Sequence, residues 1–178
     1  MRCFISIPVD EKIVEKIIEI QNQLKIPDVR LVAPENIHIT LLFLGELSER
    51  EVENVKELLN KISFDCFEIH VKGVGAFPDK KYIKIMWVGI KSENLISLAK
   101  LIYNKFNIEF EFVPHITIAR IKKISRENKN ILIKILNKFD KTDFGNYVVE
   151  EVKLMKSVLD KNGPRYSELF SKKLSKAE

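Results

Sequence analysis

One short motif occurs twice in the chain: residues 38–41 are His-Ile-Thr-Leu and residues 115–118 are His-Ile-Thr-Ile. The chain has only three His and three Thr, so two such pairs arise by chance about once in a thousand sequences of this composition. Both copies lie in strand-like segments, where residues i and i+2 share a face. Each copy therefore presents an imidazole beside a hydroxyl. The competing interpretation, buried structural His residues beside strand-forming Thr residues, explains one copy better than two.

The two imidazoles suit the transfer of two protons in one reaction. The unperturbed pKa of a histidine is about 6.5, so of His38 and His115 one can be neutral and take a proton while the other gives one. Hydrolysis of a phosphodiester needs a base on the attacking water and an acid on the leaving oxygen, on opposite sides of phosphorus. The Thr40 and Thr117 hydroxyls would donate hydrogen bonds to the non-bridging oxygens. These four residues are the predicted catalytic site.

A metal site on His38 and His115 is the alternative chemistry. Zinc needs a third protein ligand, Mg²⁺ needs carboxylates, and no Asp, Glu or Cys lies near either copy on the same strand face. We therefore expect neither a metal nor another cofactor. Arg120 follows Thr117 by three residues and could bind a phosphate, with a solvated surface charge as the equal alternative. His70 has no hydroxyl partner, which favours a structural role.

The pattern of apolar residues predicts the elements that hold these side chains: four helices and about seven strands. The predicted strands cover residues 3–8, 37–44, 67–77, 82–90, 114–121, 148–159 and 166–174. The predicted helices begin after Asp10, at the capping box of Ser48, at Ser92 and near Ser125, and a loop lies between Pro27 and Pro34. No linker-like stretch divides the chain. We expect a single α+β or α/β domain over residues 1–178.

The composition fits a globular protein. The chain has 178 residues, of which 46% are hydrophobic, and no apolar run approaches the roughly 18 residues of a membrane span. The apolar stretch near Met1 is too short for a signal peptide, so we expect a cytoplasmic protein. Cys3 and Cys66 lie in apolar segments without a Cys-x-x-Cys or Cys/His cluster, which predicts buried thiols rather than a disulfide or a zinc finger.

The net charge of +5 is unevenly distributed along the chain. Residues 1–120 carry 16 basic and 17 acidic side chains, a net charge of −1, whereas residues 121–178 carry 14 and 8, a net charge of +6. A basic segment favours a polyanion such as RNA, because it neutralises phosphates. Lys-rich solvated faces are also common in proteins that bind no nucleic acid, and in thermophiles.

The order of the motifs and their flanking residues resembles the two-histidine (2H) phosphoesterase superfamily, whose defining pattern is two His-x-Thr tetrapeptides. Within it, the chain is most similar to the RNA 2′,3′-cyclic phosphodiesterase branch, also called 2′-5′ RNA ligase. The resemblance covers nearly the whole chain. The matching segments are the opening strand at residues 3–8, the two motifs at 34–45 and 114–120, Gly-Ala-Phe-Pro at 75–78 with Trp-Val-Gly at 87–89, and Leu-Met-Lys-Ser at 154–157 with Gly-Pro-Arg-Tyr at 163–166.

This resemblance implies a bilobal α+β fold, in which two similar lobes of antiparallel sheet and helices flank a central groove and each contribute one His-x-Thr strand. It implies metal-independent hydrolysis of RNA 2′,3′-cyclic phosphate ends to a 2′-phosphomonoester, with 2′-5′ joining of RNA ends as a second activity. His38 would be the proton donor to the leaving O3′, and His115 the acceptor of a proton from water. Phe77 and Tyr166 are candidates for stacking on a base or ribose, with core packing as the alternative.

The implied partners are RNA with 2′,3′-cyclic phosphate ends, tRNA halves among them, or cyclic nucleotides. No membrane partner is expected, and the protein is expected to be a monomer. Two other interpretations stay open. A non-catalytic RNA-end or nucleotide-binding module would use the same groove without turnover, but intact His and Thr in both copies argue against it. Trimming of RNA 3′ ends and opening of a cyclic ADP-ribose phosphate share the motif, because the motif does not encode the substrate.

Overall fold

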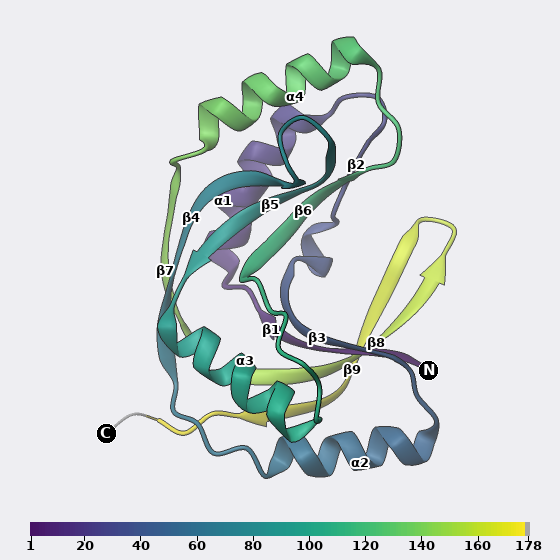
Figure 1. Cartoon of the computed structure of the whole chain (residues 1–178), viewed down its shortest axis with the longest axis vertical. Helices are drawn as coiled ribbons and strands as arrows, with labels where there is room; N and C mark the ends of the chain where they lie inside the picture. The colour runs from purple at the N-terminus through teal and green to yellow at the C-terminus, as the bar shows by residue number, and fades with distance from the viewer. Residues whose placement is uncertain (177–178) are drawn as a thin grey trace.

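The computed structural model in Figure 1 describes residues 1–176, in which two antiparallel sheets are covered by helices. The four-stranded sheet contains β1 (Arg2–Pro8), β3 (His38–Glu46), β8 (Glu151–Asp160) and β9 (Gly163–Lys173) in the order β3-β1-β8-β9. The five-stranded sheet contains β2 (Val29–Leu31), β4 (Phe67–Pro78), β5 (Ile83–Lys91), β6 (His115–Ile121) and β7 (Asp143–Val149) in the order β2-β6-β5-β4-β7.

The described residues form four α-helices and two short 3-10 helices: α1 (Glu11–Gln21), η1 (Asn22–Leu24), η2 (Pro34–Asn36), α2 (Glu49–Asn60), α3 (Glu93–Lys105) and α4 (Arg126–Phe139). The α-helices begin after Asp10, Ser48, Ser92 and Ser125, whose side chains accept hydrogen bonds from first-turn N–H groups. Helices α1 and α4 pack on the five-stranded sheet and α2 packs against β9. The predicted α+β class and the four predicted helices are confirmed.

The expectation of about seven strands was too low, because the described chain has nine. β2 lies inside the loop predicted between Pro27 and Pro34, and its three residues are too few to show an alternating pattern. The run predicted as one strand over residues 148–159 belongs to two, β7 and β8, separated at Glu150. Exposed polar residues and Gly145 interrupt the apolar pattern of β7, which explains why its beginning was missed.

The two sheets meet where the motif strands lie. β3 contacts β6, and the first residue of each strand is a motif histidine, His38 in β3 and His115 in β6. The segment after β2 also joins β6, because the Val32 N–H donates to the Ile118 carbonyl at 3.0 Å. The sheet topology therefore brings together two tetrapeptides that are far apart in the sequence.

Both cysteines are free thiols, as predicted. Cys3 is buried, but Cys66 is only half-buried, so the expectation of burial is confirmed for Cys3 alone. In residues 1–176 no helix is long and apolar enough to cross a membrane. A single domain over residues 1–178 stays a prediction.

Candidate active site

Both motif histidines are oriented by the same backbone contact. The Nδ1 atom of His38 lies 2.6 Å from the Asn36 carbonyl oxygen, and that of His115 lies 2.8 Å from the Val113 carbonyl oxygen. Because a carbonyl oxygen only accepts, each Nδ1 carries the hydrogen and donates it. Each Nε2 is thereby left as the atom that exchanges a proton with a ligand.

The threonines complete the two motifs on the same faces. Thr40 and Thr117 are half-buried, whereas the Ile residues between each His and Thr are fully buried. The Thr40 Oγ1 atom lies 2.7 Å from the Nε2 atom of His38 and donates to it when that imidazole is neutral. Within residues 1–176 the Nε2 atom of His115 has no hydrogen-bond partner. One imidazole is therefore held by its own threonine, and the other is free to meet a water molecule.

A β-bulge follows each motif at the equivalent position. In β3 the extra residue is Leu41, because Ile5 and Ser6 of β1 pair with Leu42 and Thr40. In β6 it is Ile118, because Met86 and Trp87 of β5 pair with Ala119 and Thr117. An extra residue reverses the alternation of side chains along the rest of a strand.

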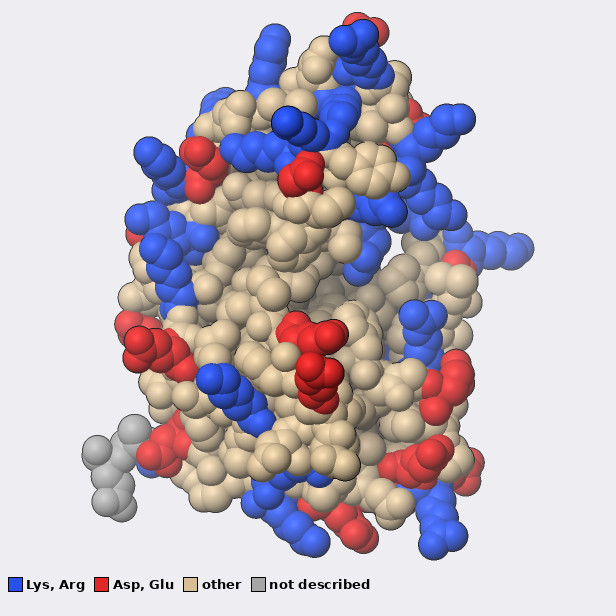
Figure 2. Space-filling view, viewed as in Figure 1, with Lys and Arg blue, Asp and Glu red and all other residues tan. Residues whose placement is uncertain are grey.

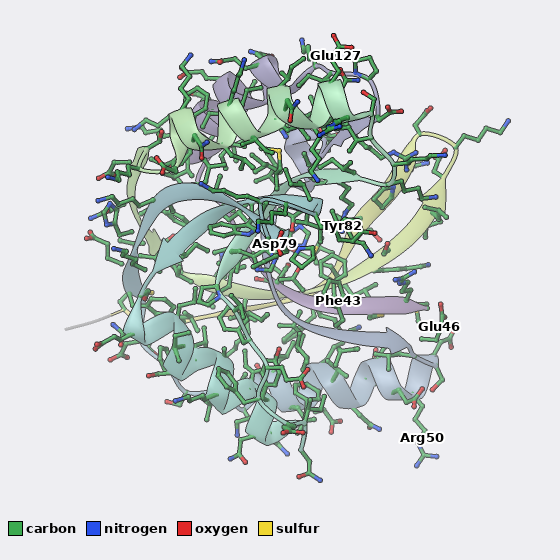
Figure 3. The ribbon with its side chains drawn as sticks, turned by 45° about the horizontal axis from the view of Figure 1, so that its top comes forward. Phe43, Glu46, Arg50, Asp79, Tyr82 and Glu127 are labelled. Carbon is green, nitrogen blue, oxygen red and sulfur yellow. The ribbon has the colours of Figure 1, made fainter. Side chains whose placement is uncertain are left out.

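The bulges change which side chains reach the site. Regular alternation would place the fifth residue after each motif histidine on the opposite face, but the bulges return Phe43 and Arg120 to the His-Thr face. Phe43 is 68% exposed and Arg120 is exposed, although both belong to strands with buried neighbours. Figure 3 labels Phe43 at the centre of the molecule, whereas Glu46 lies at the outer end of β3. The sequence interpretation did not single out Phe43, whose ring shares the face of the first motif and lies 6.3 Å from that of Phe4.

Gln21 of α1 supports the bulge in β6. Its buried side-chain amide donates to the carbonyl oxygens of Ile118, at 3.0 Å, and of Val32, at 2.9 Å. The Ile118 carbonyl also accepts from the Val32 N–H, so the Gln21 amide is its second partner, and the buried amide is itself satisfied by these two carbonyls. Gln21 is therefore a positioning residue for Thr117 and Arg120. In the sequence it is only one polar residue of an amphipathic helix.

Aromatic rings hold both imidazoles from the side. The Tyr166 ring meets His38 edge-on with 5.4 Å between centroids, and the Phe77 ring meets His115 in the same way at 5.1 Å. Phe4 lies 5.0 Å from His38. The structure thus brings both predicted aromatic candidates to the site, each against one histidine.

The Phe77 ring rests in turn on Trp87, at 5.3 Å between centroids, and the Trp87 ring lies over Gly75. A Cβ atom at Gly75 would lie 2.2 Å from Cζ2 of Trp87, which is far inside van der Waals contact. Because Gly75 has no side chain, the Trp87 ring can lie against its backbone and support Phe77, which packs against His115.

Gly75→Ala is expected to lower the free energy of unfolding by about 1–3 kcal/mol, because the added methyl group displaces the Trp87 ring. Urea unfolding of the two proteins measures the difference. The matched control is the same substitution in a Trp87→Leu background, where the methyl group has room and its cost should largely disappear. Wild-type stability in the single variant would contradict this account of the stack.

The site is electropositive. The pKa of His38 is lowered, chiefly by burial of the imidazole; the Asn36 carbonyl opposes this shift, and the positive charge of Arg120, with that of His115 when it is protonated, adds to it. Burial raises the pKa of Tyr166, against the opposing effect of Arg120. The Arg120 guanidinium is therefore close enough to affect both groups on the opposite sheet. A negatively charged ligand would relieve this accumulation of positive charge.

A pocket of about 140 Å³ opens beside His38, and its lining residues include Phe4, Met155 and Tyr166. His70 lies on β4 and pairs with Asp143 of β7 at 2.9 Å, outside the site, and its structural role stays a prediction. In residues 1–176 no group of three His, Cys, Asp or Glu side chains is arranged to hold a metal ion.

The fold and the repeated His-x-Thr strands define a two-histidine phosphoesterase. The model of the LigT like Phosphoesterase family matches the chain twice, over residues 7–87 and 88–166, so that each match contains one motif. The chain belongs to this family.

Similar proteins are found among both sequences and solved structures. The chain is 41% identical over 172 residues to the RNA 2′,3′-cyclic phosphodiesterase of Methanocaldococcus jannaschii, covering 93% of this chain and 96% of that protein. It is 36% identical to the protein of the same name from Archaeoglobus fulgidus, over 95% of this chain and 98% of that protein. The crystal structure of TT0787 of Thermus thermophilus superposes with a TM-score of 0.84 over all of both chains, at 25% identity. E. coli LigT complexed with 3′-AMP gives a TM-score of 0.76 over 98% of both chains, also at 25% identity. The predicted fold and family are thus confirmed.

Proposed function

We propose that this protein hydrolyses the 2′,3′-cyclic phosphate at RNA ends to a 2′-phosphomonoester. The observation that carries the proposal is the pair of imidazoles from two sheets, each with Nδ1 bound to a backbone carbonyl and Nε2 left for proton exchange. Full-length relatives named RNA 2′,3′-cyclic phosphodiesterase support the same activity.

In the proposed reaction His115 acts as the base and His38 as the acid. The free Nε2 of His115 takes a proton from the attacking water, and the protonated Nε2 of His38 gives one to O3′ as its bond to phosphorus breaks. The lowered pKa of His38 disfavours the protonated form in the empty site. The negative charge of the bound phosphate opposes this effect, because a nearby anion raises the pKa of an imidazole.

The hydroxyl groups and the guanidinium act on the phosphate itself. The Thr40 and Thr117 hydroxyls donate to its non-bridging oxygens, and Arg120, farther along β6, adds a longer-range attraction for the negative charge that they carry. A 5′-hydroxyl of RNA that takes the place of water would join two ends through a 2′-5′ linkage with the same two proton transfers. This is the proposed second activity, and RNA ends such as those of tRNA halves are its proposed substrates.

The aromatic residues divide into two roles. The Phe77 and Tyr166 rings both pack edge-on against a histidine, so we assign to them the orientation of the imidazoles, and contact with the ribose only at their free edges. Phe43 has the exposed ring on the site face and is the better platform for the terminal base.

The direct test of the proposal is turnover. The protein is incubated with adenosine 2′,3′-cyclic phosphate and with an RNA oligonucleotide that ends in a cyclic phosphate, and the phosphomonoester is separated by chromatography. A nucleotide-binding module would bind these compounds and release them unchanged. Binding of these compounds without formation of a phosphomonoester would therefore contradict the proposed hydrolase and favour the nucleotide-binding module.

EDTA treatment is expected to leave kcat within about twofold of the untreated value, because proton transfer and hydroxyl donors do the work that a Lewis acid would do. The rate is measured on adenosine 2′,3′-cyclic phosphate after dialysis against EDTA. The control is the same sample after addition of Zn²⁺ or Mn²⁺. Loss of activity with EDTA and its recovery with either ion would favour a metal site on the two histidines.

A further inference from the structure

Two arginines lie side by side at one end of the groove. Arg30 of β2 and Arg120 of β6 are direct partners in the antiparallel pair, and both are exposed. Directly opposed residues project from the same face of a sheet. The bulge at Ile118 has placed Arg120 on the face of Thr117, so Arg30 shares that face too.

The protein does not neutralise this pair of charges. Within residues 1–176 neither guanidinium takes part in a salt bridge with a carboxylate. Like charges at directly opposed positions destabilise a pair of strands, and an anion bound between them removes that repulsion. Two guanidinium groups favour a phosphate, because each can donate two parallel N–H hydrogen bonds to the phosphate oxygens.

The scissile phosphate already has its own partners. It carries one negative charge, and the two imidazoles and two threonine hydroxyls of the motifs surround it in the proposed reaction. An RNA end has a second phosphodiester on the 5′ side of its last nucleotide, which a cyclic mononucleotide lacks. The Cα atom of Arg120 lies about 10 Å from that of Thr117 along an extended strand, and Arg30 lies beside it on the neighbouring strand β2, so the two long side chains can reach a phosphate one nucleotide away from the motif.

The distribution of charged side chains also favours an anionic ligand that extends beyond the scissile phosphate. Figure 2 shows a hollow in the middle of the face of the molecule that is turned towards the viewer in Figure 1, with Lys and Arg side chains along its upper right rim and Asp and Glu side chains below it. A polyanion that ends in the hollow is drawn towards the basic rim.

We propose that Arg30, together with Arg120, binds the phosphodiester that precedes the cyclic end, and that this contact makes oligonucleotide ends better substrates than cyclic mononucleotides. The inference rests on the proposed hydrolase function and adds to it a second phosphate subsite with its specificity for RNA ends.

Three substrates test the subsite: adenosine 2′,3′-cyclic phosphate, the dinucleotide ApA with the same cyclic end, and that dinucleotide with a neutral methylphosphonate linkage. For the wild-type protein, kcat/KM is expected to be at least about tenfold higher for the charged dinucleotide than for the other two. Arg30→Gln should remove this advantage and change kcat/KM for the mononucleotide less than about twofold. Arg30→Lys keeps the positive charge but cannot form bidentate hydrogen bonds, so it should retain part of the preference for the charged dinucleotide.

Arg50→Gln is the matched control, because Arg50 is an exposed arginine of α2 that Figure 3 places away from the centre of the molecule. It should keep the full preference for the charged dinucleotide. Equal kcat/KM for all three substrates, or a preference that survives in Arg30→Gln or with the methylphosphonate, would overturn the subsite. If the wild-type protein hydrolyses none of them, the proposed function itself fails. Circular dichroism checks the folding of each variant, and the methylphosphonate comparison decides the question on the wild-type protein alone.

Discussion

Replacing His38 or His115 by alanine is expected to lower kcat by about 10²–10⁴, because each imidazole moves one proton in the same transition state. Both side chains are half-buried at the groove and begin their strands, so neither substitution opens a cavity in the core. Hydrolysis of adenosine 2′,3′-cyclic phosphate measures the loss. The double variant should lose little more than either single variant, because residues that act as a unit are not additive.

His70→Ala is the matched control for these variants. This histidine lies on the five-stranded sheet and pairs with Asp143 outside the site, so its loss should leave kcat unchanged. His38→Gln and His115→Gln retain most of the side-chain volume and separate a catalytic loss from a packing loss. Near-normal turnover in either folded variant would exclude an acid–base pair built on these two residues.

The sequence predicted the centre of this site because its signal is local. A His and a Thr two residues apart in a strand share a face, and this repeated pattern needs no knowledge of tertiary contacts. Both motifs lie where they were expected, at the beginning of β3 and of β6.

The bulges could not be placed from the sequence, because a bulge is defined by its pairing with another strand. Their trace is a pair of adjacent apolar residues after each threonine, Leu41-Leu42 and Ile118-Ala119, which breaks the alternation of buried and exposed residues. The bulges that these apolar pairs mark return Phe43 and Arg120 to the face of the motif residues. The contact of Gln21 with a carbonyl 97 residues away leaves no local trace at all.

The charge distribution was predicted in part. The excess of basic residues lies in residues 121–178, and α4 carries several of them along the top of the molecule in Figure 1. The two guanidiniums beside the groove come instead from residues 30 and 120, in a part of the chain whose net charge is −1. Net charge along the sequence does not reveal such a pair, because strand pairing brings it together.

Hydrolysis of adenosine 2′,3′-cyclic phosphate is expected to give adenosine 2′-monophosphate in at least about tenfold excess over the 3′ isomer. In-line displacement places the base and the acid on opposite sides of phosphorus, so a substrate held in one orientation has only one ribose oxygen beside the acid. The two imidazoles belong to different sheets, and their Nδ1 contacts keep each ring in a fixed position. The resemblance to RNA cyclic phosphodiesterases assigns O3′ to His38, and the 2′ ester bond then survives.

The two monophosphates are separated by liquid chromatography, with a sample hydrolysed without protein as the control, since uncatalysed opening yields both isomers. A dominant 3′-monophosphate would exchange the roles of His38 and His115 or reverse the orientation of the ribose. An even mixture would show that the groove does not hold the ribose in a single orientation. It would also remove the reason for assigning the base to Phe43, because a stacked base is what prevents the ribose from turning over between the two walls.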